Sequence, residues 1–229
     1  MSKILQIDTA NSLAAVSLSN EGKLLAVLES EDQKNHASFL QTAIQKMLME
    51  QQMNLNELDA VAVVAGPGSY TGLRVGLASA KGICYAIQKP IICINTLDYL
   101  AASAIHQIDP LKENSNTLFC PMMDARRMEV YTALYDNQLN KLIEPMALIL
   151  QSECFIEFLN MKKILFFGNG SRKWKNICDH SNAHLSEVAF QPFVLSEIAY
   201  QYYIKNLFSN LAYCEPTYLK DFFDTSAKH

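Results

Sequence analysis

Asp8 is the residue best placed for phosphoryl chemistry. It ends the predicted strand at residues 3–8, where a phosphotransferase built on strand–turn–strand units holds its metal and its nucleotide. The four residues that follow contain no glycine, although a phosphate-binding hairpin needs one for close approach of its ligand. We therefore expect no catalytic residue and no cofactor, with weak nucleotide binding left open. The residues of this vestigial nucleotide cleft are Asp8, Thr9, Asn11 and Ser12.

A glycine-rich segment at residues 66–74 lies between a predicted buried strand and a helix. A dinucleotide fingerprint requires G-x-G-x-x-G, but here the third glycine, Gly72, comes one residue late. A P-loop requires four residues between its glycines and then Lys-Ser/Thr, where this chain has Leu73-Arg74. We favour a tight turn into a closely packed helix, and anion binding at the helix N-terminus is the alternative.

His180 and His184 have the i, i+4 spacing that could hold zinc on one face of a helix. The segment around them is turn-like and has no adjacent glutamate to act as a base. His36 and His106 each stand alone, as capping or packing histidines do. No Gly-x-Ser-x-Gly elbow and no Cys–His pair occurs, so we predict no metal site and no nucleophile.

Composition argues against a protein that grips a nucleic acid by itself. The 229 residues carry a formal net charge of −4, whereas phosphate-backbone binding needs a concentrated basic surface. The longest basic run is Arg172, Lys173 and Lys175 around the only tryptophan, Trp174. We interpret this run as a solvated face, so that any RNA substrate must be held by another protein.

The six cysteines include no CxxC pair, which fits a reducing compartment. The first eight residues do not resemble a signal peptide. The most apolar helical stretch, residues 73–87, contains Arg74 and Lys81 and is too short to span a bilayer. We therefore predict a cytoplasmic protein with no membrane contact.

Hydrophobic periodicity predicts an α/β fold in which one topology is used twice. The polar segment at residues 109–116 marks the boundary between an N-terminal lobe at 1–108 and a C-terminal lobe at 109–210. The tail at about 211–229 is expected to pack back on the first lobe. The first lobe is predicted to hold strands at 3–8, 13–19, 23–29, 60–65 and 91–94 and helices at 36–52, 71–88 and 96–106. The second is predicted to hold strands at 118–123, 128–135, 141–150 and 163–167 and helices at 151–160 and 195–210.

The two helices at 36–52 and 71–88 carry apolar stripes beyond what a small lobe needs. In the second helix, Gly72, Gly76, Ala80 and Cys84 form a row of small residues that lets another backbone approach closely. Pattern alone leaves burial in the chain's own lobe and contact with a partner protein equally open. The candidate partner-interface residues are His36, Phe39, Leu40, Ala43, Met47, Tyr70, Thr71, Arg74, Ala78, Lys81 and Tyr85.

Five motifs, in order along nearly the whole chain, resemble those of the bacterial TsaB family. They are Ile7-Asp8-Thr9-Ala10, the block from Gly66 to Gly76, Asn95-Thr96-Leu97, the block from Asp124 to Tyr131, and Pro216-Thr217-Tyr218-Leu219-Lys220. The resemblance implies an actin/hexokinase/Hsp70-like (ASKHA) fold of two ribonuclease-H-like lobes with mixed sheets.

The resemblance also implies a function. TsaB-like chains are non-catalytic dimerisation subunits of the machinery that makes N6-threonylcarbamoyladenosine at position 37 of tRNAs reading codons that begin with adenine. The implied partners are TsaD, the catalytic relative with a metal-binding histidine pair, and the ATPase TsaE. The helices of the N-terminal lobe are implied to bind TsaD, or a second copy when the chain is alone, and tRNA is contacted only through the complex.

This chain departs from the family at Lys220, where Arg is frequent, and at the doubled Arg126-Arg127, where a single Arg is usual. Residues 151–192 match nothing specific. Three rival functions stay open from the sequence. They are a small-molecule phosphotransferase of the same fold, a metallopeptidase that uses His180 and His184, and a stand-alone RNA-binding module.

Overall fold

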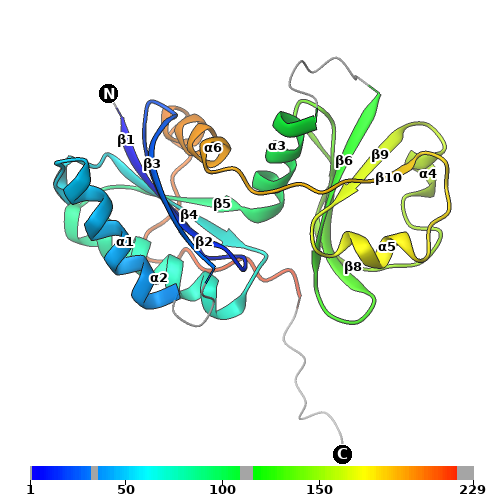
Figure 1. Cartoon of the computed structure of the whole chain (residues 1–229), viewed down its shortest axis with the longest axis horizontal. Helices are drawn as coiled ribbons and strands as arrows, with labels where there is room; N and C mark the ends of the chain where they lie inside the picture. Colours follow the sequence, from blue (N-terminus) through cyan, green and yellow to red (C-terminus); the bar gives the residue numbers. More distant parts are fainter. Residues whose placement is uncertain (1, 32–35, 109–115, 221–229) are drawn as a thin grey trace, which may run out of the picture.

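A computed structural model describes residues 2–31, 36–108 and 116–220, and it shows two α/β lobes (Figure 1). Each lobe is built on a five-stranded mixed sheet, with strand orders β3-β2-β1-β4-β5 and β10-β9-β6-β7-β8. In each sheet the first three strands along the chain pair antiparallel. The two later strands are then added in parallel beside the first one, β4 and β5 beside β1, and β9 and β10 beside β6. The duplicated α/β topology predicted from periodicity is therefore confirmed.

The N-terminal sheet is covered on both faces, which explains the wholly apolar strand β4. Its first face packs α1 and α2 against side chains such as Leu5, Val16 and Val61. Its second face packs α6 against side chains such as Ile4 and Ala62. The strands are β1 (Lys3–Asp8), β2 (Ala14–Asn20), β3 (Lys23–Ser30), β4 (Ala60–Gly66) and β5 (Ile91–Asn95), and the helices are α1 (His36–Glu50), α2 (Tyr70–Ile87) and α6 (Pro192–Ile204).

The C-terminal sheet packs short helices on its outer face around Trp174, whose ring is fully buried between Phe155 and Phe166. The predicted helix at 151–160 is shorter than expected, and two elements, α5 and β10, were not predicted. The elements are β6 (Thr117–Asp124), β7 (Glu129–Tyr135), β8 (Lys141–Ile149), α4 (Ile156–Leu159), β9 (Lys163–Phe167), α5 (Ser171–Lys175) and β10 (Ala183–Leu185).

Helix α3 (Thr96–Ile108) lies between the lobes (Figure 1). Leu100 and Ala104 pack on the C-terminal sheet, whereas Tyr99 and Ala102 pack on the N-terminal one, so every residue from Thr96 to Ile105 is buried. The predicted division at residues 108 and 109 separates the sheets but is wrong for the helices. α3 serves both lobes, and α6, predicted in the second lobe, packs on the first because its apolar side covers β1 and β5.

Residues 209–220, which we call the C-terminal strap, run back along the N-terminal lobe and then cross to the second lobe (Figure 1). Ser209 bridges β5, Leu211 and Cys214 join the core beneath α2, and the Thr217 amide donates to the Ala65 carbonyl at 2.7 Å. The strap therefore packs on the first lobe as far as Thr217, and its last residue, Lys220, contacts Glu129 of the second lobe. Residues 221–229 and the predicted boundary segment 109–115 lie outside the described residues.

The first turn of α2 packs against main chain of the β1–β2 turn. A Cβ built on Gly72 would lie 2.0 Å from the Thr9 carbonyl oxygen. A Cβ on Gly82, later in the same helix, would have no neighbour within 4 Å. The row of small residues that begins at Gly72 therefore faces the chain's own lobe.

Two glycine-to-alanine changes in this one helix are expected to change the free energy of unfolding in opposite directions. Gly72→Ala forces two backbone segments apart and should lower the free energy of unfolding by about 2 kcal/mol or more. Gly82→Ala restores helix propensity at an open site and should raise the free energy of unfolding by roughly 0.5–1 kcal/mol. Urea unfolding followed by circular dichroism measures both, and equal effects would contradict the packing described.

Candidate protein-binding face and inter-lobe cleft

The apolar stripe of α1 faces the chain's own sheet. Leu40 and Met47 are fully buried and Ala43 is 4% exposed, all three within the core of the N-terminal lobe. The prediction that these three residues contact a partner is therefore wrong, because the sheet face beneath α1 takes up the stripe. Phe39 is half-buried against the same core. The side chain of His36 lies outside the described residues.

The outward side of α1 is polar, and it was not predicted as part of the interface. Gln41, Thr42, Gln45 and Lys46 are exposed there, and Gln41 Nε2 donates to Ser79 Oγ of α2 at 3.0 Å. The two helices therefore lie side by side and present one composite surface (Figure 1). In the sequence, the polar residues that lie between the apolar residues of α1 could have indicated this exposed side.

α2 exposes a long strip of its surface. Ser69 caps the helix by accepting from the Gly72 amide at 3.3 Å. Beyond the cap, Tyr70 and Thr71 are exposed, and Tyr85 is 72% exposed. Between them runs an exposed row at four-residue spacing, which consists of Arg74, Ala78, Gly82 and Ala86. Of these, Gly82 and Ala86 were not predicted, although their spacing from Ala78 could have indicated them.

The two cations of the predicted interface are engaged within the chain. The Arg74 guanidinium lies 4.1 Å from the Tyr70 ring centroid, and its Nε donates to Tyr218 Oη at 3.1 Å. Lys81 Nζ, only partly exposed, donates to the carbonyls of Ala212 and Cys214 at 3.0 and 3.1 Å. Both side chains therefore fasten the C-terminal strap to α2.

A cleft of about 1320 Å³ separates the lobes. Of the four residues predicted for a vestigial nucleotide cleft, Asn11 and Ser12 line it, whereas Asp8 and Thr9 do not. Asp8 is 4% exposed and its Oδ1 accepts from the Ala10 amide at 2.9 Å. Thr9 is fully buried, and its hydroxyl donates to the Gly72 carbonyl at 2.7 Å. The structure thus splits the predicted group into two lining residues and two buried ones.

Main chain of the β1–β2 turn lies against the glycine-rich segment just before α2. The Ser69 amide donates to the Ala10 carbonyl at 2.7 Å, and a Cβ on Gly68 would meet the same oxygen at 2.5 Å. The β1–β2 turn therefore sits where a phosphate would approach this helix end. Burial raises the pKa of Asp8 to about 6, and the Ala10 amide opposes only part of that shift.

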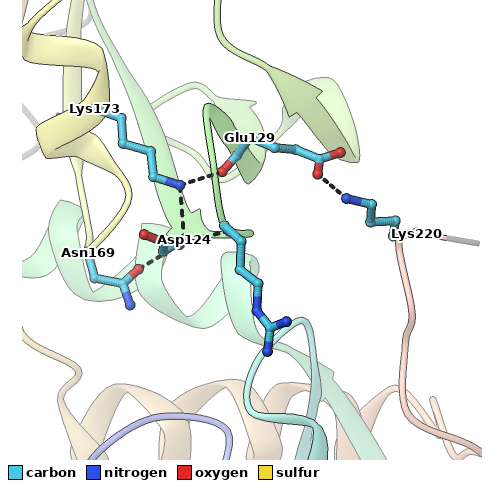
Figure 2. Close-up of polar contacts among 6 residues, drawn as sticks. Asp124, Glu129, Asn169, Lys173 and Lys220 are labelled. Carbon is cyan, nitrogen blue, oxygen red and sulfur yellow. Dashed lines mark hydrogen bonds and ion pairs between the residues drawn. The ribbon is translucent and has the colours of Figure 1, made fainter. Parts of the chain in front are cut away.

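The opposite wall of the cleft holds a set of ionic contacts at the carboxyl ends of β6 and β9 (Figure 2). Lys173 Nζ lies 3.0 Å from Asp124 Oδ1 and donates to the Glu129 carbonyl at 2.8 Å. Asn169 Oδ1 accepts from the Asp124 amide at 2.8 Å. Lys220 of the C-terminal strap pairs with the Glu129 carboxylate. The departure from Arg to Lys at this position therefore keeps an ion pair between the strap and the second lobe.

His180 and His184 do not share a helix face. His184 lies in the short strand β10 and is exposed, while His180 Nδ1 accepts from the Asn182 amide at 3.1 Å. Within residues 2–31, 36–108 and 116–220, no three His, Cys, Asp or Glu side chains come together as a metal site would require. Over the same residues, no helix has the length and apolar character needed to cross a membrane.

Two lobes that repeat one mixed-sheet topology around a shared helix define a duplicated ribonuclease-H-like fold of the ASKHA class. A family model described as "TsaD: tRNA N6-adenosine threonylcarbamoyltransferase" matches residues 26–221. The "tRNA threonylcarbamoyladenosine biosynthesis protein TsaB" of Bacillus subtilis is 31% identical over 180 residues, which are 77% of this chain and 75% of that protein. The Escherichia coli protein of the same name is 33% identical over 60% of this chain and 57% of its own length. The chain belongs to the TsaB family.

Solved structures agree on the fold. "YeaZ from Pseudomonas aeruginosa" superposes with a TM-score of 0.76 at 23% identity, covering 96% of this chain and all of that one. A Pseudomonas aeruginosa protein described as similar to peptidase YEAZ gives a TM-score of 0.81 at 22% identity over the same shares. The two-lobed ASKHA architecture is therefore confirmed.

Asp8 is expected to make stability depend on pH. Because its folded pKa lies above the ordinary value of 3.8, protonation favours the folded state, and this contribution is lost as pH rises from about 4 through about 6. Asp8→Asn keeps an acceptor for the Ala10 amide and has no charge to bury. At pH 8 it should raise the free energy of unfolding by about 2–3 kcal/mol relative to the parent chain.

The difference between Asp8→Asn and the parent chain should shrink toward pH 4. Urea unfolding between pH 4 and pH 8 measures it by far-UV circular dichroism, because the only tryptophan lies in the other lobe. A difference that stays constant over this range would show that the Asp8 carboxylate is not destabilised by burial.

Proposed function

We propose that this chain is a non-catalytic subunit that binds TsaD and is required for N6-threonylcarbamoyladenosine formation on tRNAs reading codons that begin with adenine. The observation that carries the proposal is the exposed face of α2. Membership in a family whose relatives are named for the biosynthesis of this nucleoside supports the pathway, and the TsaD family model supports kinship with the partner.

The α2 face suits a closely packed helical partner. Ala78, Gly82 and Ala86 leave a shallow track along the helix, and Tyr85 stands at its end as a large exposed anchor. Small side chains let another helix approach closely, and an aromatic anchor supplies much of an interface's binding energy. Gly82 has no neighbour of its own within the described residues that accounts for a glycine in the middle of a helix. The revised interface is therefore Tyr70, Thr71, Arg74, Ala78, Gly82, Tyr85 and Ala86, with Gln41 and Gln45 of α1 alongside.

The absence of catalysis in this chain is part of the proposal. Asp8 is withdrawn from the cleft, and the Ser69 amide at the start of α2 bonds the Ala10 carbonyl of the β1–β2 turn. Asp124, on the other wall, is paired with Lys173. Under this proposal TsaD carries out the chemistry and TsaE joins the complex. When the chain is alone, the same α2 face forms a homodimer.

Ala78→Glu tests the α2 face. A buried, unpaired carboxylate in a packed interface costs several kcal/mol, so co-purification with TsaD should fall at least a hundredfold. The fold should persist because Ala78 is exposed in the free chain. A charge at Ala43 would be uninformative, since it would disrupt the lobe's own core.

Ala189→Glu is the matched control, because Ala189 is also exposed but lies on the connection before α6. It should leave complex formation unchanged, as measured by size-exclusion chromatography with light scattering. Alone, the parent chain should be a dimer at micromolar concentration and Ala78→Glu a monomer. Unchanged assembly of Ala78→Glu with TsaD would refute the assignment of this face.

Reconstitution tests the function itself. Threonylcarbamoylation of tRNA by TsaD and TsaE should require this chain, and mass spectrometry of the digested tRNA measures the modified nucleoside. Modification at the full rate without the chain would reject its role as a required subunit.

A further inference from the structure

The second lobe carries a group of cations in and beside the cleft that the proposed function leaves unexplained. Residues 125–128 follow β6 and residues 168–175 follow β9, and these parallel neighbours deliver both segments to one edge of the sheet. The Asp124 amide, bonded to Asn169 at 2.8 Å, ties the segments together (Figure 2). We call the exposed cations of the two segments the basic rim, which consists of Arg126, Arg127, Arg172 and Lys175.

The carboxylates beside the basic rim are already neutralised. Lys173 pairs with Asp124 at 3.0 Å, and Lys220 pairs with Glu129. By contrast, none of the four rim side chains has a hydrogen bond or an ion pair with the residues that the structure describes. Besides Asp124, Glu187 is the one described carboxylate that lines the cleft. The rim is therefore locally positive in a chain whose formal net charge is −4.

The backbone holds these cations in place. Arg126 and Arg127 adopt φ angles of 69° and 47°. Residues other than glycine and asparagine seldom adopt this left-handed conformation. Three hydrogen bonds fix the turn. The Arg126 amide donates to Asp124 Oδ1 at 2.6 Å. The Glu129 amide donates to the Arg126 carbonyl, and the Ala125 amide donates to the Glu129 carbonyl, both at 3.1 Å. Hydrogen bonds thus fix the backbone of the turn that carries the two exposed arginines.

On the second segment, a buried tryptophan orients the cations. Arg172 and Lys175 are three residues apart on α5 and both line the cleft. Between them, Trp174 is fully buried in the core of the lobe and Lys173 turns back to Asp124. The cation run, interpreted from the sequence as a solvated face, therefore lies on an anchored helix that places Arg172 and Lys175 at the cleft.

We propose that the basic rim binds phosphate groups of the tRNA backbone when the chain is part of the modification complex. This inference rests on the proposed function, and it adds a direct contact with tRNA where the sequence predicted only an indirect one. Guanidinium groups match phosphate geometry, and such contacts orient a nucleic acid without reading its sequence. Four cations spread over two segments fit several phosphates along a strand. One free nucleotide in the cleft would leave Arg126 and Arg127 unused, because they do not line it.

The test is the double variant Arg126→Gln/Arg127→Gln in the complex with TsaD and TsaE. The KM for tRNA in threonylcarbamoylation should rise about tenfold with kcat unchanged, because phosphate contacts act on binding. The slope of log KM against log salt concentration should fall by about 2, close to one per lost contact. Arg172→Gln/Lys175→Gln should give the same result from the other segment, which separates charge loss from distortion of the β6–β7 turn.

Lys23→Gln/Lys163→Gln is the matched control, because it removes two exposed charges far from the rim. Lys23 begins β3, and Lys163 begins β9 at the end opposite Asn169. This control should change the KM for tRNA less than twofold. Thermal melts by circular dichroism verify that all the variants fold.

The outcomes separate the inference from the function on which it rests. If the parent chain fails to support modification, the proposed function is wrong. If it supports modification and both rim variants match the control in KM and salt slope, the inference is overturned while the function stands. Calorimetry with ATP tests the alternative that the basic rim binds the phosphates of a free nucleotide. Loss of ATP binding in the rim variants with an unchanged KM for tRNA would overturn the inference in favour of a nucleotide.

Discussion

The contact between the β1–β2 turn and the first turn of α2 is the constraint on which both the cleft and the exposed α2 face depend. Thr9 hydrogen-bonds the Gly72 carbonyl, and a single added methyl group on Gly72 would collide with the Thr9 main chain. Because the turn sits so close, the helix end is bonded to protein rather than open to a phosphate. The same contact fixes the axis of α2, and with it the direction in which the outward row from Arg74 to Ala86 faces.

Ties between the lobes extend this constraint across the molecule. Helix α3 is buried from both sides, and its Asp98 accepts from Tyr135 of the second lobe at 2.6 Å. On another path, the C-terminal strap binds Arg74 through Tyr218 and Glu129 through Lys220. The α2 face and the turn that carries Arg126 and Arg127 are therefore joined by one short segment of chain. A partner bound at one surface is consequently held at a defined position relative to the other.

Much of the fold could be predicted from the sequence because strand and helix periods differ, and most predicted elements lie within a few residues of those observed. The three-residue strand β10 could not, since it has mostly exposed side chains and pairs only with β9. The site was harder for another reason. A helical period tells which residues share a face, but not whether that face meets the chain's own sheet or another protein. Leu40, Ala43 and Met47 were assigned to the wrong surface on that account, whereas Ala78 and Tyr85 are exposed.

Net charge misleads in a similar way, because it averages over surfaces that act separately. A net negative charge disfavours capture of RNA from solution, whereas a local cluster of cations still attracts RNA that another protein holds nearby. Linking two weak sites in one rigid assembly turns the second contact into an intramolecular event, governed by effective concentration. A rim such as that of Arg126 and Arg172 then needs little affinity of its own. What it needs is a fixed position, and the bonded turn, the buried Trp174 and the strap supply that position.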